Sequence, residues 1–179
     1  KSPCLNQIIQ AAKNLEQMGC RAIAAECGYF AYFQKEVAGA VDVPVFMSSL
    51  LQIPLIQQII GPKKQVGIFC GAKEALLPEH LSNVGVDPNS DIVVCGGLDE
   101  YNIVELQNLW YTNVRPKIPT ASYNKVEEDM VNAVKDMVKR YPRIGAIMLE
   151  CTGFQPFARA IQRAVDLPVF SWGTLLDYA

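Results

Sequence analysis

The segment Glu150-Cys151-Thr152-Gly153 decides how this chain folds, because a related segment, Glu26-Cys27-Gly28-Tyr29, lies 124 positions before it. Around these segments, residues 21–51 align with residues 145–175 without a gap, and 13 of the 31 positions are identical. The copies begin AIAAEC and AIMLEC and end AVDVPVF and AVDLPVF. A repeat of this length indicates two halves of one design, each with a cysteine at the same structural position.

The pattern of apolar runs predicts alternating strands and helices. Strands are expected at 21–25, 43–47, 65–70, 91–95, 144–149 and 167–170, and helices at 4–18, 30–40, 73–83, 101–110, 122–140 and 154–165, with one more helix after Ser48 and Ser49. Continuous apolar strands that alternate with helices indicate parallel sheets covered on both faces. We therefore expect an α/β fold with a first lobe at 1–62, a second lobe at 63–173, and residues 174–179 returning to the first lobe.

The repeat also bears on the start of the chain. The second half has two strands before its long helix, whereas the first half has none before residue 4. Since a parallel sheet of this design needs the corresponding strand, we expect the natural N-terminus, with at least one core strand, to precede this sequence.

Composition narrows the class of protein. The 179 residues are 50% hydrophobic and 19% charged, which is typical of a globular α/β protein. The net charge of −2 and the lack of a basic stripe argue against a nucleic-acid scaffold, and no apolar run approaches the length of a membrane span. The six cysteines form no CxxC pair, so we expect reduced thiols and a cytoplasmic location.

Cys27 and Cys151 are the candidate catalytic residues. Each follows a buried strand and precedes a helix, at the carboxyl edge of the sheet where ligands bind. The helix dipole and free N–H groups there favour a thiolate. A single strand-end cysteine is more often structural, but two at equivalent positions of a repeat favour function.

If the halves face each other, two sulfurs approach one ligand from opposite sides. One thiolate can then remove a proton from an acidic carbon and the opposite thiol can return one, which inverts the stereocentre. The backbone N–H groups of Gly28, Tyr29, Thr152 and Gly153 are expected to bind a substrate carboxylate. Turn geometry alone is the alternative explanation for the two glycines.

Several neighbouring residues have less specific interpretations. Glu26 and Glu150 either tune the adjacent cysteines or accept hydrogen bonds from loop N–H groups. Ser48 and Ser49 are mainly helix-capping candidates, with substrate contact as the alternative. His80, the only histidine, is expected on the surface. A metal site or a histidine-based triad is therefore not expected, and no GxGxxG or P-loop pattern supports a nucleotide cofactor.

At the segments AECGYFAYFQ and LECTGFQPFARAI, followed by DVPVFMSSLL and DLPVFSWGTLL, the sequence resembles the aspartate/glutamate racemase superfamily. The resemblance covers essentially the whole chain. It implies two pseudosymmetric flavodoxin-like lobes with the active site between them, Cys27 and Cys151 as the acid/base pair, and no metal or pyridoxal cofactor. Glutamate and aspartate racemases usually carry Asn-Thr after the first cysteine, whereas Gly28-Tyr29 follows here, so amino-acid specificity is not implied.

Three functions remain open at this point. The leading hypothesis is a cofactor-independent racemase or epimerase that acts on a small carboxylate-bearing substrate. The first alternative is a lyase or cis–trans isomerase of the same superfamily, such as a decarboxylase or a maleate isomerase. A non-catalytic ligand-binding or thiol-redox module is the second. The sequence leaves a homo-oligomeric assembly open.

Overall fold

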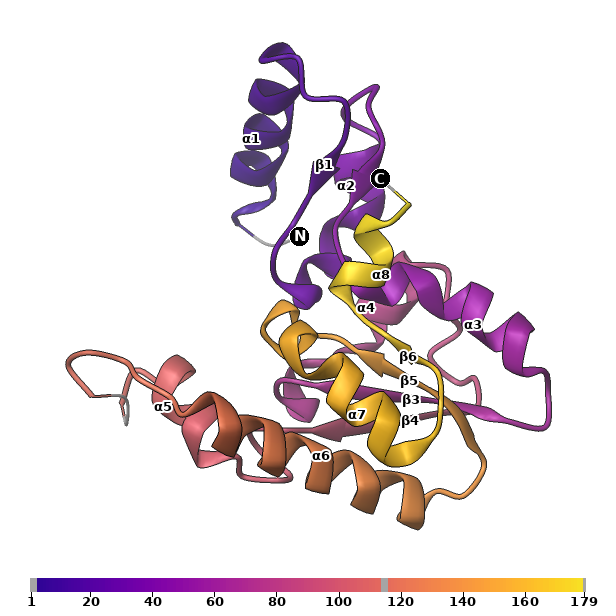
Figure 1. The fold of residues 1–179 in the computed structure, drawn as a ribbon. Coiled ribbons are helices and arrows are strands. Elements are labelled where there is room, and N and C mark those ends of the chain that lie inside the picture. Colours follow the sequence, from indigo (N-terminus) through magenta and orange to yellow (C-terminus); the bar gives the residue numbers. More distant parts are fainter. Residues whose placement is uncertain (1–2, 114–115, 179) are drawn as a thin grey trace.

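Two parallel sheets organise the molecule (Figure 1). The computed structural model describes residues 3–113 and 116–178. The larger sheet has the strand order β4-β3-β5-β6, and the smaller sheet pairs β1 with β2. The strands are β1 (Ile23–Ala24), β2 (Val45–Phe46), β3 (Gln65–Cys70), β4 (Ile92–Gly96), β5 (Ile144–Leu149) and β6 (Val169–Phe170). All neighbouring strands run parallel, which confirms the predicted α/β fold with two parallel-sheet lobes.

Helices connect the strands in the expected order. The α-helices are α1 (Leu5–Gln17), α2 (Gln34–Ala38), α3 (Ile53–Ile60), α4 (Pro78–Asn83), α5 (Val104–Trp110), α6 (Tyr123–Arg140), α7 (Ala158–Val165) and α8 (Trp172–Leu176). The described residues also form four 3₁₀ helices: η1 (Gly28–Phe33), η2 (Ser49–Gln52), η3 (Lys73–Ala75) and η4 (Thr152–Phe157).

Three helices that the sequence predicts as continuous are split in the structure. Residues 30–40 and 154–165 begin as the 3₁₀ helices η1 and η4 and become α-helical only at Gln34 and Ala158. The predicted helix 73–83 divides into η3 and α4, because Leu77 is extended (φ −78°, ψ 158°). Pro78 disfavours the helical conformation for the residue before it.

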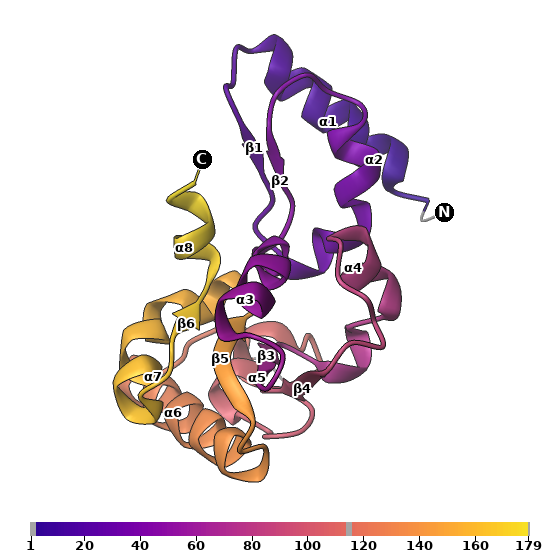
Figure 2. The same cartoon turned by 90° about the vertical axis from the view of Figure 1, so that its right-hand side faces the viewer.

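The larger sheet is buried on both faces because its side chains alternate between two apolar clusters. Phe69, Ile147 and Leu149 pack with residues of α6 and α7. Val66, Ile68 and Met148 pack instead with residues of η2 and α3. Figure 1 shows α6 and α7 together on one side of this sheet, and Figure 2 shows α3 between the two sheets. The core is therefore centred on β3 and β5.

The sequence repeat is also a repeat in three dimensions. In the first copy Ile23 pairs with Val45 and Ala24 with Phe46. In the second copy the corresponding pairs are Ile147 with Val169 and Met148 with Phe170. The helices η1 and η4 also correspond residue for residue. The two halves are thus built on one plan, as the repeat predicts.

Two segments near the expected lobe boundaries connect the halves. Helix α3 precedes the boundary expected at residue 62, yet Ile53 and Ile56 pack in the core of the larger sheet. Helix α8 contacts η2, and both views show it extending from the larger sheet towards the smaller one. The Thr174 hydroxyl donates to Gln52 Oε1 at 2.7 Å.

Candidate active site

The structure places Cys27 and Cys151 at equivalent positions. Each directly precedes a 3₁₀ helix, with extended backbone dihedrals of −92° and 128° at Cys27 and −79° and 135° at Cys151. In each copy the cysteine carbonyl accepts a hydrogen bond of 3.0 Å, from Phe30 N–H or from Phe154 N–H. Both thiols are free. The local fold of the repeat therefore presents two thiols in the same way.

The two sulfurs share one electrostatic environment. Cys27 is exposed and Cys151 is half-buried. A Cβ added at Gly28, next to Cys27, would meet the carbonyl and carboxyl of Glu150, next to Cys151, so the structure brings the two cysteine segments together. Charge on Cys27 is also one cause of the raised pKa of Cys151. Two halves that are 124 residues apart in sequence thus contribute one thiol each to the same region.

Both thiols resist ionisation, contrary to the thiolate expected at these strand ends. Partial burial is the largest cause that raises the pKa of Cys27, and the Tyr29 N–H opposes it. Burial, and then the charge of Glu150, raise the pKa of Cys151 to about 12, against the Gly153 N–H. The predicted N–H contribution is present, but desolvation and a nearby carboxylate outweigh it.

The residues after the first cysteine hold the two halves together. An added Cβ at Gly28 would lie 2.7 Å from Glu150 Cδ and closer still to its oxygens, so only glycine fits there. The Tyr29 hydroxyl donates to the Ala72 carbonyl and accepts from the Ala72 N–H, both at 2.7 Å. Gly28 and Tyr29 therefore contact the edge of the larger sheet.

The residues after the second cysteine differ from them. Thr152 and Gly153 are half-buried in the first turn of η4. An added Cβ at Gly153 would lie 2.9 Å from Trp110 Cζ2 and 3.7 Å from Cys151 Sγ. The ring of Trp110 thus occupies the space that a side chain at position 153 would need, beside the Cys151 sulfur.

Ser48 and Ser49, at the start of η2, are buried. Ser48 Oγ accepts from the Leu50 N–H at 3.2 Å, which confirms its helix-capping interpretation. Ser49 Oγ contacts the carbonyl oxygens of Leu149 and Glu150 at 3.1 and 3.0 Å. Ser49 thus supports the backbone next to Cys151 instead of capping the helix, and direct contact of either serine with a substrate stays a prediction.

Glu150 combines the two roles considered for it. Its Oε2 accepts from the Gly71 N–H at 3.1 Å, and its charge acts on both cysteines. The side chain is 1% exposed, and burial raises its pKa to about 7. Glu26, at the equivalent position of the first copy, is exposed. The repeat therefore carries a buried carboxyl on one side only.

Two residues have a place in this region that sequence reasoning missed. Trp110 is one. Its signal in the sequence is that the second copy has Gly153 where the first has Tyr29, so another side chain can fill the space of the missing ring. His80 is the other, and its expected surface position is wrong because it is 6% exposed. Its Nδ1 accepts from the Leu77 N–H at 2.9 Å, and its ring packs edge-on against Tyr29. Burial lowers the pKa of His80.

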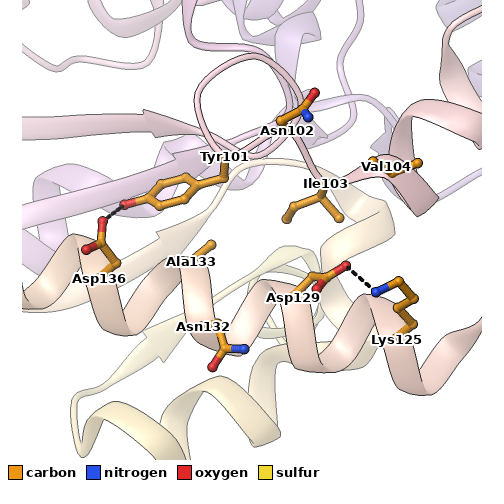
Figure 3. Close-up of a pocket in the computed structure, with 9 residues that line it drawn as sticks. All are labelled: Tyr101, Asn102, Ile103, Val104, Lys125, Asp129, Asn132, Ala133 and Asp136. Atoms are coloured by element: carbon orange, nitrogen blue, oxygen red, sulfur yellow. Dashed lines mark hydrogen bonds and ion pairs between the residues drawn. The ribbon is translucent and has the colours of Figure 1, made fainter.

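A separate hollow lies away from the cysteines, between helix α6 and the segment that precedes α5 (Figure 3). Its volume is about 510 Å³. Tyr101 donates to Asp136, and Lys125 pairs with Asp129 along its wall. It contains none of the predicted site residues. Within residues 3–113 and 116–178, no cluster of three His, Cys, Asp or Glu side chains suits a metal ion, and no helix is long and apolar enough to cross a membrane.

Comparison with curated proteins finds relatives that are lyases. The chain is 30% identical over 158 residues to a protein from Durusdinium sp. clade D named dimethylsulfoniopropionate lyase. The match covers 87% of this chain and 50% of that protein. The chain spans about half the length of the curated relatives it matches. No family model matches the sequence.

Solved structures confirm the fold that the resemblance implies. An aspartate racemase homologue from Pyrococcus horikoshii OT3 matches with a TM-score of 0.61 and 20% identity, over 93% of this chain and 67% of that one. Unliganded arylmalonate decarboxylase matches with a TM-score of 0.57 and 10% identity, over 97% of this chain and 72% of that one. At these identities the likeness concerns the fold alone.

Proposed function

Because this chain has the fold of the aspartate/glutamate racemase superfamily, we propose that it is a carbon-acid lyase in which Cys27 and Cys151 supply the acid/base groups. The observation that carries the proposal is the pair of thiols presented by matching strand pairs of a structural repeat. The names of the curated relatives favour elimination over racemisation, so the leading hypothesis from sequence becomes the second candidate here.

The proposed reaction keeps the first step of a racemase and changes the second. Dimethylsulfoniopropionate has an acidic C–H on its α-carbon, next to the carboxylate. Its sulfonium group is bonded to the adjacent β-carbon. A thiolate removes the α-proton, and the electron pair forms the carbon–carbon double bond while the carbon–sulfur bond breaks. Dimethyl sulfide leaves as a neutral molecule, acrylate remains, and the sulfur holds the proton until solvent takes it.

The unequal exposure of the two thiols assigns their roles within this proposal. Cys27 is exposed, so it is the candidate base. Cys151, with a pKa of about 12, stays protonated at neutral pH and acts as a neutral donor towards the substrate. The N–H groups of Gly28 and Thr152 are the candidate contacts for the carboxylate, while those of Tyr29 and Gly153 act on the sulfurs.

Trp110 supports a sulfonium substrate. Its six-membered ring lies against Gly153 and beside the Cys151 sulfur, and 39% of the residue is exposed. The attraction between an indole face and a cation stabilises the contact by about 0.5–2 kcal/mol, most where water is excluded. This aromatic surface would hold the positively charged end of the substrate while the thiols act on the carbon next to its carboxylate.

The test is release of dimethyl sulfide from dimethylsulfoniopropionate by the full-length protein, measured by gas chromatography. Cys27→Ser and Cys151→Ser are each expected to lower kcat at least about 100-fold, the usual contribution of a positioned acid or base. Cys20→Ser, at a half-buried cysteine outside the site, is the matched control and should keep full activity. Wild-type release by both site variants would contradict the proposal.

A racemase or epimerase remains the second candidate, because two thiols contributed by two halves suit two-sided proton transfer. It predicts exchange of a substrate α-hydrogen with solvent deuterium at a stereocentre, without an unsaturated product. Loss of exchange in both cysteine variants would favour it. Binding without turnover, together with a Cys27–Cys151 disulfide on mild oxidation, would instead favour the non-catalytic module.

A further inference from the structure

Glu150 is a buried ionisable group that the proposed reaction does not use. It directly precedes Cys151 and is 1% exposed. Its N–H donates to the Phe69 carbonyl at 3.0 Å, and its carbonyl accepts from Ser49 Oγ at 3.0 Å. The backbone at this position is therefore held on both sides, and the carboxyl has a defined place.

The carboxyl group is only half satisfied. Oε2 accepts from the Gly71 N–H at 3.1 Å, whereas Oε1 is buried and has no hydrogen-bond partner among the described residues. In the part of the chain that the structure describes, no lysine or arginine pairs with Glu150. A buried carboxylate without a cation favours its protonated form, and its pKa is raised to about 7 by burial.

The titratable groups around this carboxyl all carry negative charge when they ionise. Tyr29 faces it from η1 and Cys70 from the end of β3, and the charge of Glu150 raises the pKa of each. It also raises the pKa of Cys27 and of Cys151. The exposed Glu26 acts on both cysteines as a smaller cause. Each ionisation here therefore opposes the others.

We propose that Glu150 is a positioning residue whose proton decides whether the site thiols can ionise, so that the buried site carries one negative charge at a time. With Glu150 ionised, its charge lowers the fraction of each site thiol that is ionised. With Glu150 protonated, one thiol can become a thiolate and act as a base. The interplay is electrostatic, since no hydrogen bond joins the Glu150 carboxyl to either sulfur among the described residues.

The experiment measures thiol alkylation rather than turnover. The wild-type protein and Glu150→Gln are treated with iodoacetamide between about pH 5.5 and 9, and labelling of Cys27 and Cys151 is followed peptide by peptide by mass spectrometry. Only the thiolate reacts, so the rate reports the ionised fraction. At about pH 5.5, where wild-type Glu150 is protonated, both proteins should react equally. At about pH 8.5 the variant should react roughly tenfold faster, which corresponds to one pKa unit.

Glu26→Gln is the matched control, because it removes the same charge at an exposed position. Its effect should be smaller and should vanish at high salt, whereas the effect of Glu150→Gln should persist. Two results would overturn the proposal: slower alkylation in Glu150→Gln, as expected for a direct proton acceptor, or a rate change that is the same at every pH, as expected for a structural role.

A second measurement keeps the proposal testable if Glu150→Gln unfolds. The single variants Cys27→Ser and Cys151→Ser each keep one site thiol. The alkylation rate of that thiol, plotted against pH, should deviate near pH 7 from the curve of a group that titrates alone. A simple one-step curve in both would contradict the proposal. Because alkylation does not require turnover, these experiments test the role of Glu150 independently of the proposed lyase reaction.

Discussion

At the residue scale, glycine decides how closely the two halves approach. Gly28 lies against the carboxyl and carbonyl of Glu150, so the first half contacts the edge of the larger sheet there. Gly153, at the position equivalent to Tyr29, leaves space for Trp110. The same repeat therefore has two differently shaped sides, which suits a substrate with two different ends.

Gly28→Ala should destabilise the protein strongly. The new Cβ would meet the Glu150 backbone, which cannot move away as a flexible side chain could. Overpacking of this kind costs about 1–3 kcal/mol. Urea unfolding should show this loss, whereas Gly71→Ala, whose Cβ would meet the Tyr29 hydroxyl at an ordinary 3.5 Å, should be nearly neutral. Equal stability of the two variants would contradict the close contact.

Gly153→Ala should disturb the site through Trp110. The added methyl group would lie 2.9 Å from the indole ring, so the ring would have to move. Trp110→Ala removes the obstacle, so the double variant should recover stability that the glycine substitution alone loses. A double-mutant cycle of unfolding free energies should give a coupling of about 0.5–3 kcal/mol. Simple additivity of the two changes would contradict this contact.

At the scale of elements, the strand pairs could be predicted and the helices only in part. The strand predictions held to within a few residues because apolar, β-branched runs bounded by turn residues specify buried parallel strands. The helices after each cysteine begin as 3₁₀ turns, because the first hydrogen bond closes back onto the cysteine carbonyl from three residues on. The pattern of apolar residues does not distinguish such a 3₁₀ turn from the first turn of an α-helix.

Ser49 links two elements that are 100 residues apart in sequence, η2 and the end of β5. Its buried hydroxyl contacts two carbonyl oxygens next to Cys151. Ser49→Ala leaves these acceptors without that donor, which should lower the free energy of unfolding by about 1–3 kcal/mol. The exposed Ser82→Ala is the control and should change stability by less than about 0.5 kcal/mol. A neutral Ser49→Ala would show that the hydroxyl is dispensable.

At the scale of the whole molecule, the buried Glu150 couples stability to pH. A carboxyl whose folded pKa lies above its unfolded value stabilises the fold fully below the unfolded pKa. That contribution is lost as pH rises through the folded pKa. With values of 4.5 and about 7, roughly 3 kcal/mol should be lost between about pH 4.5 and 8.

This pH dependence can be isolated with Glu150→Gln. Urea unfolding at several pH values should show the variant gaining stability relative to wild type by about 3 kcal/mol from pH 5 to 8. His80, whose pKa is lowered by burial, acts in the opposite direction, and its effect is common to both proteins and cancels. A constant difference between the two proteins would mean that Glu150 does not titrate in this range.

The sequence alone determined the repeat, the parallel α/β fold and the equivalence of Cys27 and Cys151. These follow from periodicity and from matching residues, which are local properties of the chain. Only the tertiary structure decided how the thiols ionise, because desolvation and the charge of Glu150 depend on what surrounds each sulfur. It also buried His80 and placed Trp110 beside Gly153, since both positions result from packing between segments that are distant in sequence.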